Sequence, residues 1–88
     1  MISMNYELVF TGKGNREFNK LPRAAKVPVL IAISGLKENP RPSGCLKVQG
    51  KKDEWRIRIG DFRVAYGVND DSRIIEIRSV GKREHFYG

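Results

Sequence analysis

The chain has 88 residues, of which 40% are hydrophobic, and this suits one domain over residues 1–88 with one modest core. Seventeen Lys and Arg against ten Asp and Glu give a formal net charge of +7, which favours a polyanionic partner, either nucleic acid or an acidic protein. The single cysteine, Cys45, excludes an intramolecular disulfide and a Cys-rich metal site. No apolar run approaches the roughly 20 residues that span a bilayer and no signal peptide pattern opens the chain, so we expect a cytoplasmic location.

The first half of the chain predicts one strand followed by two helices. Residues 5–11 alternate apolar and polar side chains, which is typical of a strand. A short helix is expected over residues 16–21 with Asn15 as its cap. A second helix begins at Pro22, and Pro28 should kink or restart it because proline removes one backbone hydrogen bond. The residues expected to face the core are Tyr6, Leu8 and Phe10 of the strand, and Val27, Leu30, Ile31, Ser34 and Leu36 of the second helix.

From Leu46 onward the hydrophobic period changes to two, which predicts an antiparallel meander. Gly60 and Asp61 form a two-residue turn, residues 69–72 form a second turn, and a last strand covers residues 73–80. Two N-terminal helices packed on one face of an antiparallel β-sheet give an α+β fold class.

The expected hairpin registers bring arginines together on the face away from the helices. Arg58, Arg63 and Arg78 should form a row across three neighbouring strands, with Arg56 on the same face. Like charges that face each other destabilise a sheet by a few tenths to about 1 kcal/mol per pair, so the row suggests that an anion binds there. The alternative is a solvated basic face without a ligand. The expected pairs are Ile59–Phe62, Arg58–Arg63, Ile57–Val64 and Arg56–Ala65, then Tyr66–Ile75, Val64–Ile77 and Arg63–Arg78.

The C-terminal segment, residues 80–88 (VGKREHFYG), adds cations, one imidazole and two aromatic rings. Arginine binds phosphate through two parallel hydrogen bonds, and an aromatic ring that stacks on an unpaired base contributes about 1–3 kcal/mol. The sequence holds no metal-ligand cluster, P-loop, Ser-His-Asp set or dinucleotide-binding motif. The chemistry therefore depends on the arginines and on a few residues of this segment.

The run from Trp55 to Tyr66, WRIRIGDFRVAY, resembles a hallmark of the RelE/ParE toxin superfamily, in which alternating basic and aliphatic residues precede Gly-Asp-aromatic-Arg. The run IRSVGKR over residues 77–83, with Tyr87 four residues further on, is similar to a second hallmark of this superfamily. The resemblance covers nearly the whole chain and is most specific over residues 46–87. It implies a toxin of a type II toxin–antitoxin system, a RelE-type mRNA interferase that acts on mRNA in the ribosomal A site.

The resemblance also implies a reaction without metal or cofactor. The 2′-hydroxyl attacks the adjacent phosphate, which needs stabilisation of charge on phosphorus and transfer of two protons. The residues that match the family's positions are Arg56 and Arg58 as the basic pair, Arg63 as the phosphate clamp, Arg83 beside the leaving group, and Tyr87 on the scissile nucleotide.

The basic pair departs from the family, which often has lysine there. Arginine is a poorer general base because its pKa exceeds 12. The base is then His85 or Tyr87, or the rate comes mainly from electrostatics and positioning by the ribosome. His85 could equally be an ordinary exposed histidine. Glu76 is a further candidate for the base, although we expect it to pair with a neighbouring arginine.

Two other functions remain open from the sequence. The ParE branch shares the fold but poisons DNA gyrase, and an inactive relative would act only as a binding protein. In either branch the resemblance implies an antitoxin protein that lays a helix on an apolar surface or adds a strand to a sheet edge. We expect it to cover the arginine face or to displace the segment that carries Arg83 and Tyr87.

Overall fold

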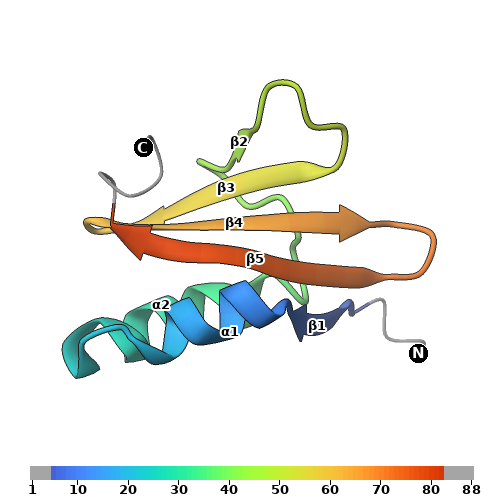
Figure 1. The fold of residues 1–88 in the computed structure, drawn as a ribbon. Coiled ribbons are helices and arrows are strands. Elements are labelled where there is room, and N and C mark those ends of the chain that lie inside the picture. Colours follow the sequence, from blue (N-terminus) through green and yellow to red (C-terminus); the bar gives the residue numbers. More distant parts are fainter. Residues whose placement is uncertain (1–4, 83–88) are drawn as a thin grey trace.

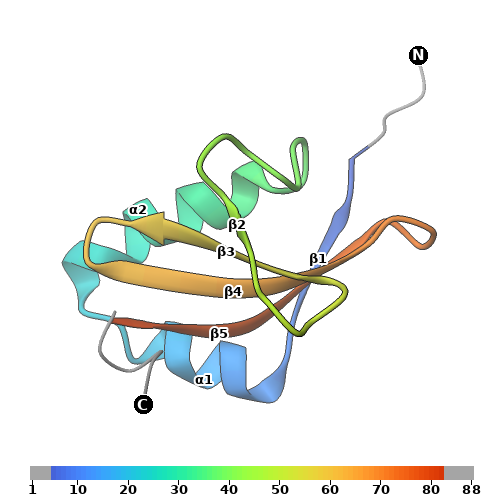
Figure 2. The ribbon, with the colours of Figure 1, turned by 90° about the horizontal axis from the view of Figure 1, so that it is seen from above.

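The computed structural model describes residues 5–82 of the chain. Two helices cover one face of a five-stranded sheet, as predicted (Figures 1 and 2). Neither helix in this range is long and apolar enough to cross a membrane. In chain order the elements are β1 (Glu7–Phe10), α1 (Gly12–Asn19), α2 (Arg23–Gly35), β2 (Leu46–Lys47), β3 (Glu54–Ile59), β4 (Phe62–Asn69) and β5 (Ile74–Lys82).

The strand order is β1-β5-β4-β3-β2, so the first and the last strand of the chain are neighbours. Strands β2 to β5 form the predicted antiparallel meander. The β1 strand differs, because it pairs with β5 in parallel and Phe10 lies beside Ile77. The sheet is therefore antiparallel except along this pair.

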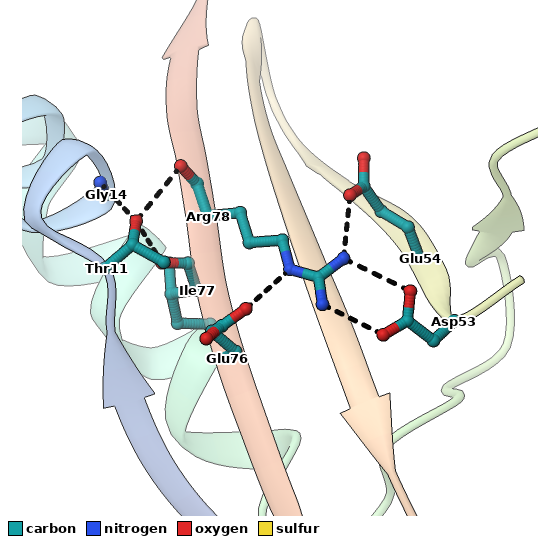
Figure 3. A network of polar contacts seen from close by, with 7 residues as sticks. All are labelled: Thr11, Gly14, Asp53, Glu54, Glu76, Ile77 and Arg78. Atoms are coloured by element: carbon teal, nitrogen blue, oxygen red, sulfur yellow. Dashed lines mark hydrogen bonds and ion pairs between the residues drawn. The ribbon is translucent and has the colours of Figure 1, made fainter. Parts of the chain in front are cut away.

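The first helix begins earlier than the sequence predicts, at Gly12, and its cap is Thr11 rather than Asn15. The Thr11 hydroxyl oxygen accepts a hydrogen bond from the Gly14 amide at 2.9 Å, and the hydroxyl lies 3.2 Å from the Ile77 carbonyl oxygen, to which it donates (Figure 3). A Cβ at Gly14 would clash with that carbonyl. Gly14 thus allows the close approach of α1 to β5.

The second helix presents a different face to the core from the one predicted. Of the predicted set only Leu36 is buried, whereas Val27 is 62% and Ile31 67% exposed. The helix is apolar around most of its circumference, so the hydrophobic period alone does not decide which stripe packs on the sheet. The α2 residues that are buried instead are Ala25, Val29 and Ile33.

Pro28 lies inside α2, and the helix continues through it as one element from Arg23 to Gly35. The expected restart of the helix at this proline is therefore wrong. Proline has no amide hydrogen, so one hydrogen bond of the helix is missing at this point. Packing of the buried stripe against the sheet holds the helix together across the gap.

The loop between α2 and β2 is tied to the sheet by contacts of two neighbouring residues, Pro40 and Arg41. Tyr66 is fully buried, and its hydroxyl donates to the Pro40 carbonyl at 2.7 Å. Burial raises the pKa of the Tyr66 hydroxyl, which keeps it protonated as a donor. Next to Pro40, the Arg41 guanidinium lies 4.5 Å from the centre of the Trp55 ring and pairs with Asp70 at 2.7 Å.

Candidate nucleic-acid interface

Two arginines face each other on the side of the sheet that the helices leave uncovered. The β3–β4 hairpin turns at Gly60, whose φ of 60° favours glycine, and Arg58 lies directly opposite Arg63, as the sequence predicts. Every predicted pair of this hairpin is confirmed, including Arg56 opposite Ala65. Arg56 and Arg58 are two residues apart on one strand and so point to the same face.

Burial distinguishes the two facing arginines. Arg63 is only 4% exposed, whereas Arg58 is exposed to solvent. A guanidinium beside a second one, in a region with little water, is a strong site for an anion because each charge is poorly screened. The pair is therefore the best candidate in residues 5–82 for contact with a phosphate.

The predicted register of the second hairpin is wrong, and Arg78 does not join the row. The turn residues are 70–73 rather than 69–72, so β4 extends to Asn69 and Tyr66 pairs with Ile77 instead of Ile75. Arg73 adopts a left-handed φ of 59° in this turn, which lets β5 begin one residue later than expected.

A register shift between Ala65 and Tyr66 then changes the pairing once more. Beyond the shift, Ala65 pairs with Ser79 and Arg63 pairs with Gly81, and Arg78 lies in the irregularity without a paired residue on β4. Glycine has no side chain, and Arg63 consequently has no bulky cross-strand neighbour on β5.

Arg78 instead binds three carboxylates at the opposite end of the sheet (Figure 3). Its Nε lies 2.7 Å from Glu76, its Nη1 2.9 Å from Glu54, and its Nη2 2.9 Å from Asp53. The guanidinium lies over Gly67, where a Cβ would clash with it. The expectation that Glu76 pairs with an arginine is confirmed.

These contacts make Arg78 an unsuitable phosphate ligand. The hydrogen bond from Arg78 holds the pKa of Asp53 below its ordinary value, and the same contact raises the pKa of Arg78. Three carboxylates around one guanidinium leave this cluster negative. No pattern in the sequence predicts the contacts of Arg78 to Asp53 and Glu54, because they depend on the observed register of the β4–β5 hairpin, which differs from the predicted one.

The predicted residues Arg83, His85 and Tyr87 lie outside the described residues. The last described residue, Lys82, pairs with Phe62 next to the β3–β4 turn. β5 therefore ends at the same end of the sheet as Arg58 and Arg63. Among residues 5–82, no group of three or more His, Cys, Asp or Glu side chains is arranged to hold a metal ion.

Solved structures define the class of fold. The chain is similar to a chain of the archaeal RelE–RelB complex from Pyrococcus horikoshii, with a TM-score of 0.78, 27% identity, and 90% of this chain and 96% of that chain covered. It is similar to a chain of the intact RelBE toxin–antitoxin complex of Escherichia coli, with a TM-score of 0.79, 26% identity, and 88% and 95% covered. The fold is RelE-like.

Sequence comparisons give the family. The model described as ParE toxin of type II toxin-antitoxin system, parDE, matches residues 10–87. A protein of Escherichia coli named as a RelE-like toxin is 33% identical over 84 residues, which are 92% of this chain and 86% of that protein. A Methanocaldococcus jannaschii protein named as toxin RelE1 is 43% identical over 58 residues, 62% of this chain and 64% of its own length. The chain belongs to the RelE/ParE toxin family of type II toxin–antitoxin systems.

Proposed function

We propose that this toxin is a ribosome-dependent mRNA endoribonuclease that cuts the codon in the A site. The observation that supports the proposal is the pairing of Arg58 with the buried Arg63 on the uncovered face of the sheet. Two facing cations cost stability in the free protein, and a phosphate between them removes that cost. An RNA phosphodiester supplies such an anion.

In this proposal the arginines stabilise the pentacoordinate phosphate that forms when the 2′-hydroxyl attacks. Arg63 clamps two phosphate oxygens, and Arg56 and Arg58 add positive charge from β3. Arg83 assists the leaving 5′-oxygen, Tyr87 stacks on the scissile nucleotide, and His85 or Tyr87 handles a proton. The products are a 2′,3′-cyclic phosphate and a 5′-hydroxyl, and the chemistry takes place in the cytoplasm, where the ribosome is.

Primer extension on an mRNA in a cell-free translation system tests the proposal. The wild-type protein should produce cuts in phase with codons, and Arg63→Ala, Arg83→Ala and Tyr87→Ala should remove them. Lys52→Ala is the matched control, since Lys52 is exposed and precedes β3 at the end of the sheet opposite the β3–β4 turn. Intact mRNA with the wild-type protein would refute the proposal.

A second candidate function is inhibition of DNA gyrase, because the matching family model describes the ParE toxin. A supercoiling assay with purified gyrase separates the two. Blocked supercoiling together with intact mRNA would favour gyrase inhibition. If supercoiling proceeds and the mRNA stays intact, the protein is a binding protein without either activity.

The proposed protein partner is an antitoxin, as in the RelB complexes of the solved relatives. Exposed apolar side chains on α2 support this, because Val27, Leu30 and Ile31 share one helix face at spacings of three and four residues. An amphipathic helix of the antitoxin would cover this stripe.

A further inference from the structure

The two ends of the molecule differ in how their charged side chains are distributed. Figure 1 shows the β3–β4 turn and the connection from α1 to α2 at one end, opposite the β4–β5 turn. Lysines and arginines gather at the first end, where the turn residue Asp61 is an exception. Carboxylates gather at the other end, around Arg78 and in the β4–β5 turn. The basic end carries Lys20, Arg58, Arg63 and Lys82, whereas at the other end the carboxylates of Asp53, Glu54, Asp70, Asp71 and Glu76 lie among the cations Arg41, Lys51, Lys52, Arg73 and Arg78.

A hollow of about 350 Å³ lies at the basic end, between α1 and the last residues of β5. Three lysines line it, Lys13 from α1, Lys20 at the C-terminal cap of that helix, and Lys82 from β5. Lys13 and Lys20 are seven residues apart, two helical turns, so they project from one face of α1. None of the three takes part in the ion pairs found within residues 5–82, which all involve Arg41 or Arg78.

The one acidic residue that lines the hollow, Glu17, is engaged with β5. Its Oε1 accepts hydrogen bonds from the Ser79 hydroxyl at 2.9 Å and from the Val80 amide at 2.8 Å. Both contacts hold α1 against the edge of β5 beyond the end of β1. Three ammonium groups and one carboxylate leave the hollow with a net positive charge, and a bound anion would offset it.

The hollow and the arginine pair lie on either side of β5, which forms the edge of the sheet here because β1 pairs with it only as far as Ile77. Gly81 lines the hollow and is also the residue that pairs with Arg63. Neighbouring strands lie about 5 Å apart, so the hollow begins one strand beyond Arg63. A chain with regularly spaced negative charges can reach both places, whereas a single small anion can fill only one.

We propose that the hollow lined by Lys13, Lys20 and Lys82 is a second phosphate site, which binds the RNA backbone next to the phosphate held by Arg63. Lysines suit this role, because a flexible ammonium group contacts a phosphate without reading the base. The site adds affinity and fixes the direction in which the RNA strand leaves the sheet. The choice of RNA as ligand rests on the proposed function.

Binding of a short 2′-O-methyl RNA oligonucleotide tests the site without ribosomes and without cleavage, because the blocked 2′-oxygen cannot attack. Fluorescence anisotropy between roughly 50 and 200 mM salt gives the slope of log K against log salt, about 0.7 for each phosphate contact on a single strand. The Lys13→Gln/Lys20→Gln double variant should reduce the slope by about 1.4, with affinity about 10- to 30-fold lower near 0.1 M salt. Glutamine keeps the helix propensity of lysine, and circular dichroism confirms the fold.

The matched control is Lys51→Gln/Lys52→Gln, which removes the same two charges from exposed positions before β3. It should keep the wild-type slope. Equal slopes in both double variants, or no binding of the wild-type protein at low salt, would overturn the proposal. Binding with the expected slopes but intact ribosome-bound mRNA would refute the proposed cleavage and keep the phosphate site. If the wild-type protein cleaves mRNA but the Lys13→Gln/Lys20→Gln variant keeps the wild-type slope of log K against log salt, the phosphate site is refuted and the proposed cleavage is not.

Discussion

The guanidinium of Arg78 lies directly over the backbone of Gly67, the residue on β4 that has no side chain to block it. Carboxylates on three sides fix the guanidinium there. This contact explains why a strand interior contains glycine, which normally weakens a strand. It also joins β3, β4 and β5 through one side chain.

Replacing Gly67 with alanine should therefore destabilise the protein. The added Cβ would push the Arg78 guanidinium away from its carboxylates, an overpacking cost of about 1–3 kcal/mol. Gly35→Ala is the control, because nothing lies within 4 Å of a Cβ at the end of α2. Alanine there should raise the free energy of unfolding by about 0.4–1 kcal/mol. Urea denaturation measures both, and a stabilised Gly67→Ala variant would contradict the assignment.

The contact between Arg78 and Asp53 should make stability depend on acid pH. The pKa of Asp53 is lower in the folded chain than in the unfolded chain, mainly because Arg78 donates a hydrogen bond to it. Its contribution is therefore complete above the unfolded pKa, near 4, and is lost as pH falls through the lower folded pKa. As the pH is lowered from about 6 to 2, the urea midpoint of unfolding should fall less steeply for Asp53→Asn than for the wild-type protein. Identical pH dependence of the two proteins would exclude this contribution.

The β3–β4 hairpin could be predicted in full, while the β4–β5 hairpin could not, and the difference lies in the turns. Gly60-Asp61 allows one tight connection, so one register follows from it. The turn before β5 contains several polar residues that can each begin it, and the left-handed Arg73 decides among them. The local sequence pattern does not indicate the register shift beside Tyr66, so the position of Arg78 could not be predicted.

The helices show a similar limit. An almost wholly apolar α2 has two stripes that could face a sheet, and only the packing with α1 and the strands selects Val29 and Ile33. At α1, the sequence predicted a helix only from residue 16, whereas the helix begins at Gly12 and needs glycine at position 14 for contact with Ile77. Of the candidate site, the pairing of Arg58 with Arg63 followed from the sequence because it depends on the hairpin alone.

The buried hydroxyl of Tyr66 gives a prediction about the loop between α2 and β2. Tyr66→Phe leaves the partly buried Pro40 carbonyl without this donor, which should cost about 1–2 kcal/mol. The matched control is Tyr6→Phe, since the Tyr6 hydroxyl bonds to Asp70 at the exposed surface, where water can replace it. Thermal unfolding of both variants checks this, and equal losses would show that burial does not matter at Tyr66.

The facing arginines should respond differently to replacement by lysine. Arg63 is buried and its planar fork is suited to grip two phosphate oxygens, so Arg63→Lys should lower the cleavage rate by about 10²–10³-fold although the charge is kept. Arg58 is exposed and lies at a position where the family often has lysine, so Arg58→Lys should stay within about tenfold of wild type. Codon-phased cleavage in a cell-free translation system gives both rates. If Arg63→Lys cleaves as fast as the wild-type protein, a point charge is enough at this position and the clamp is not bidentate.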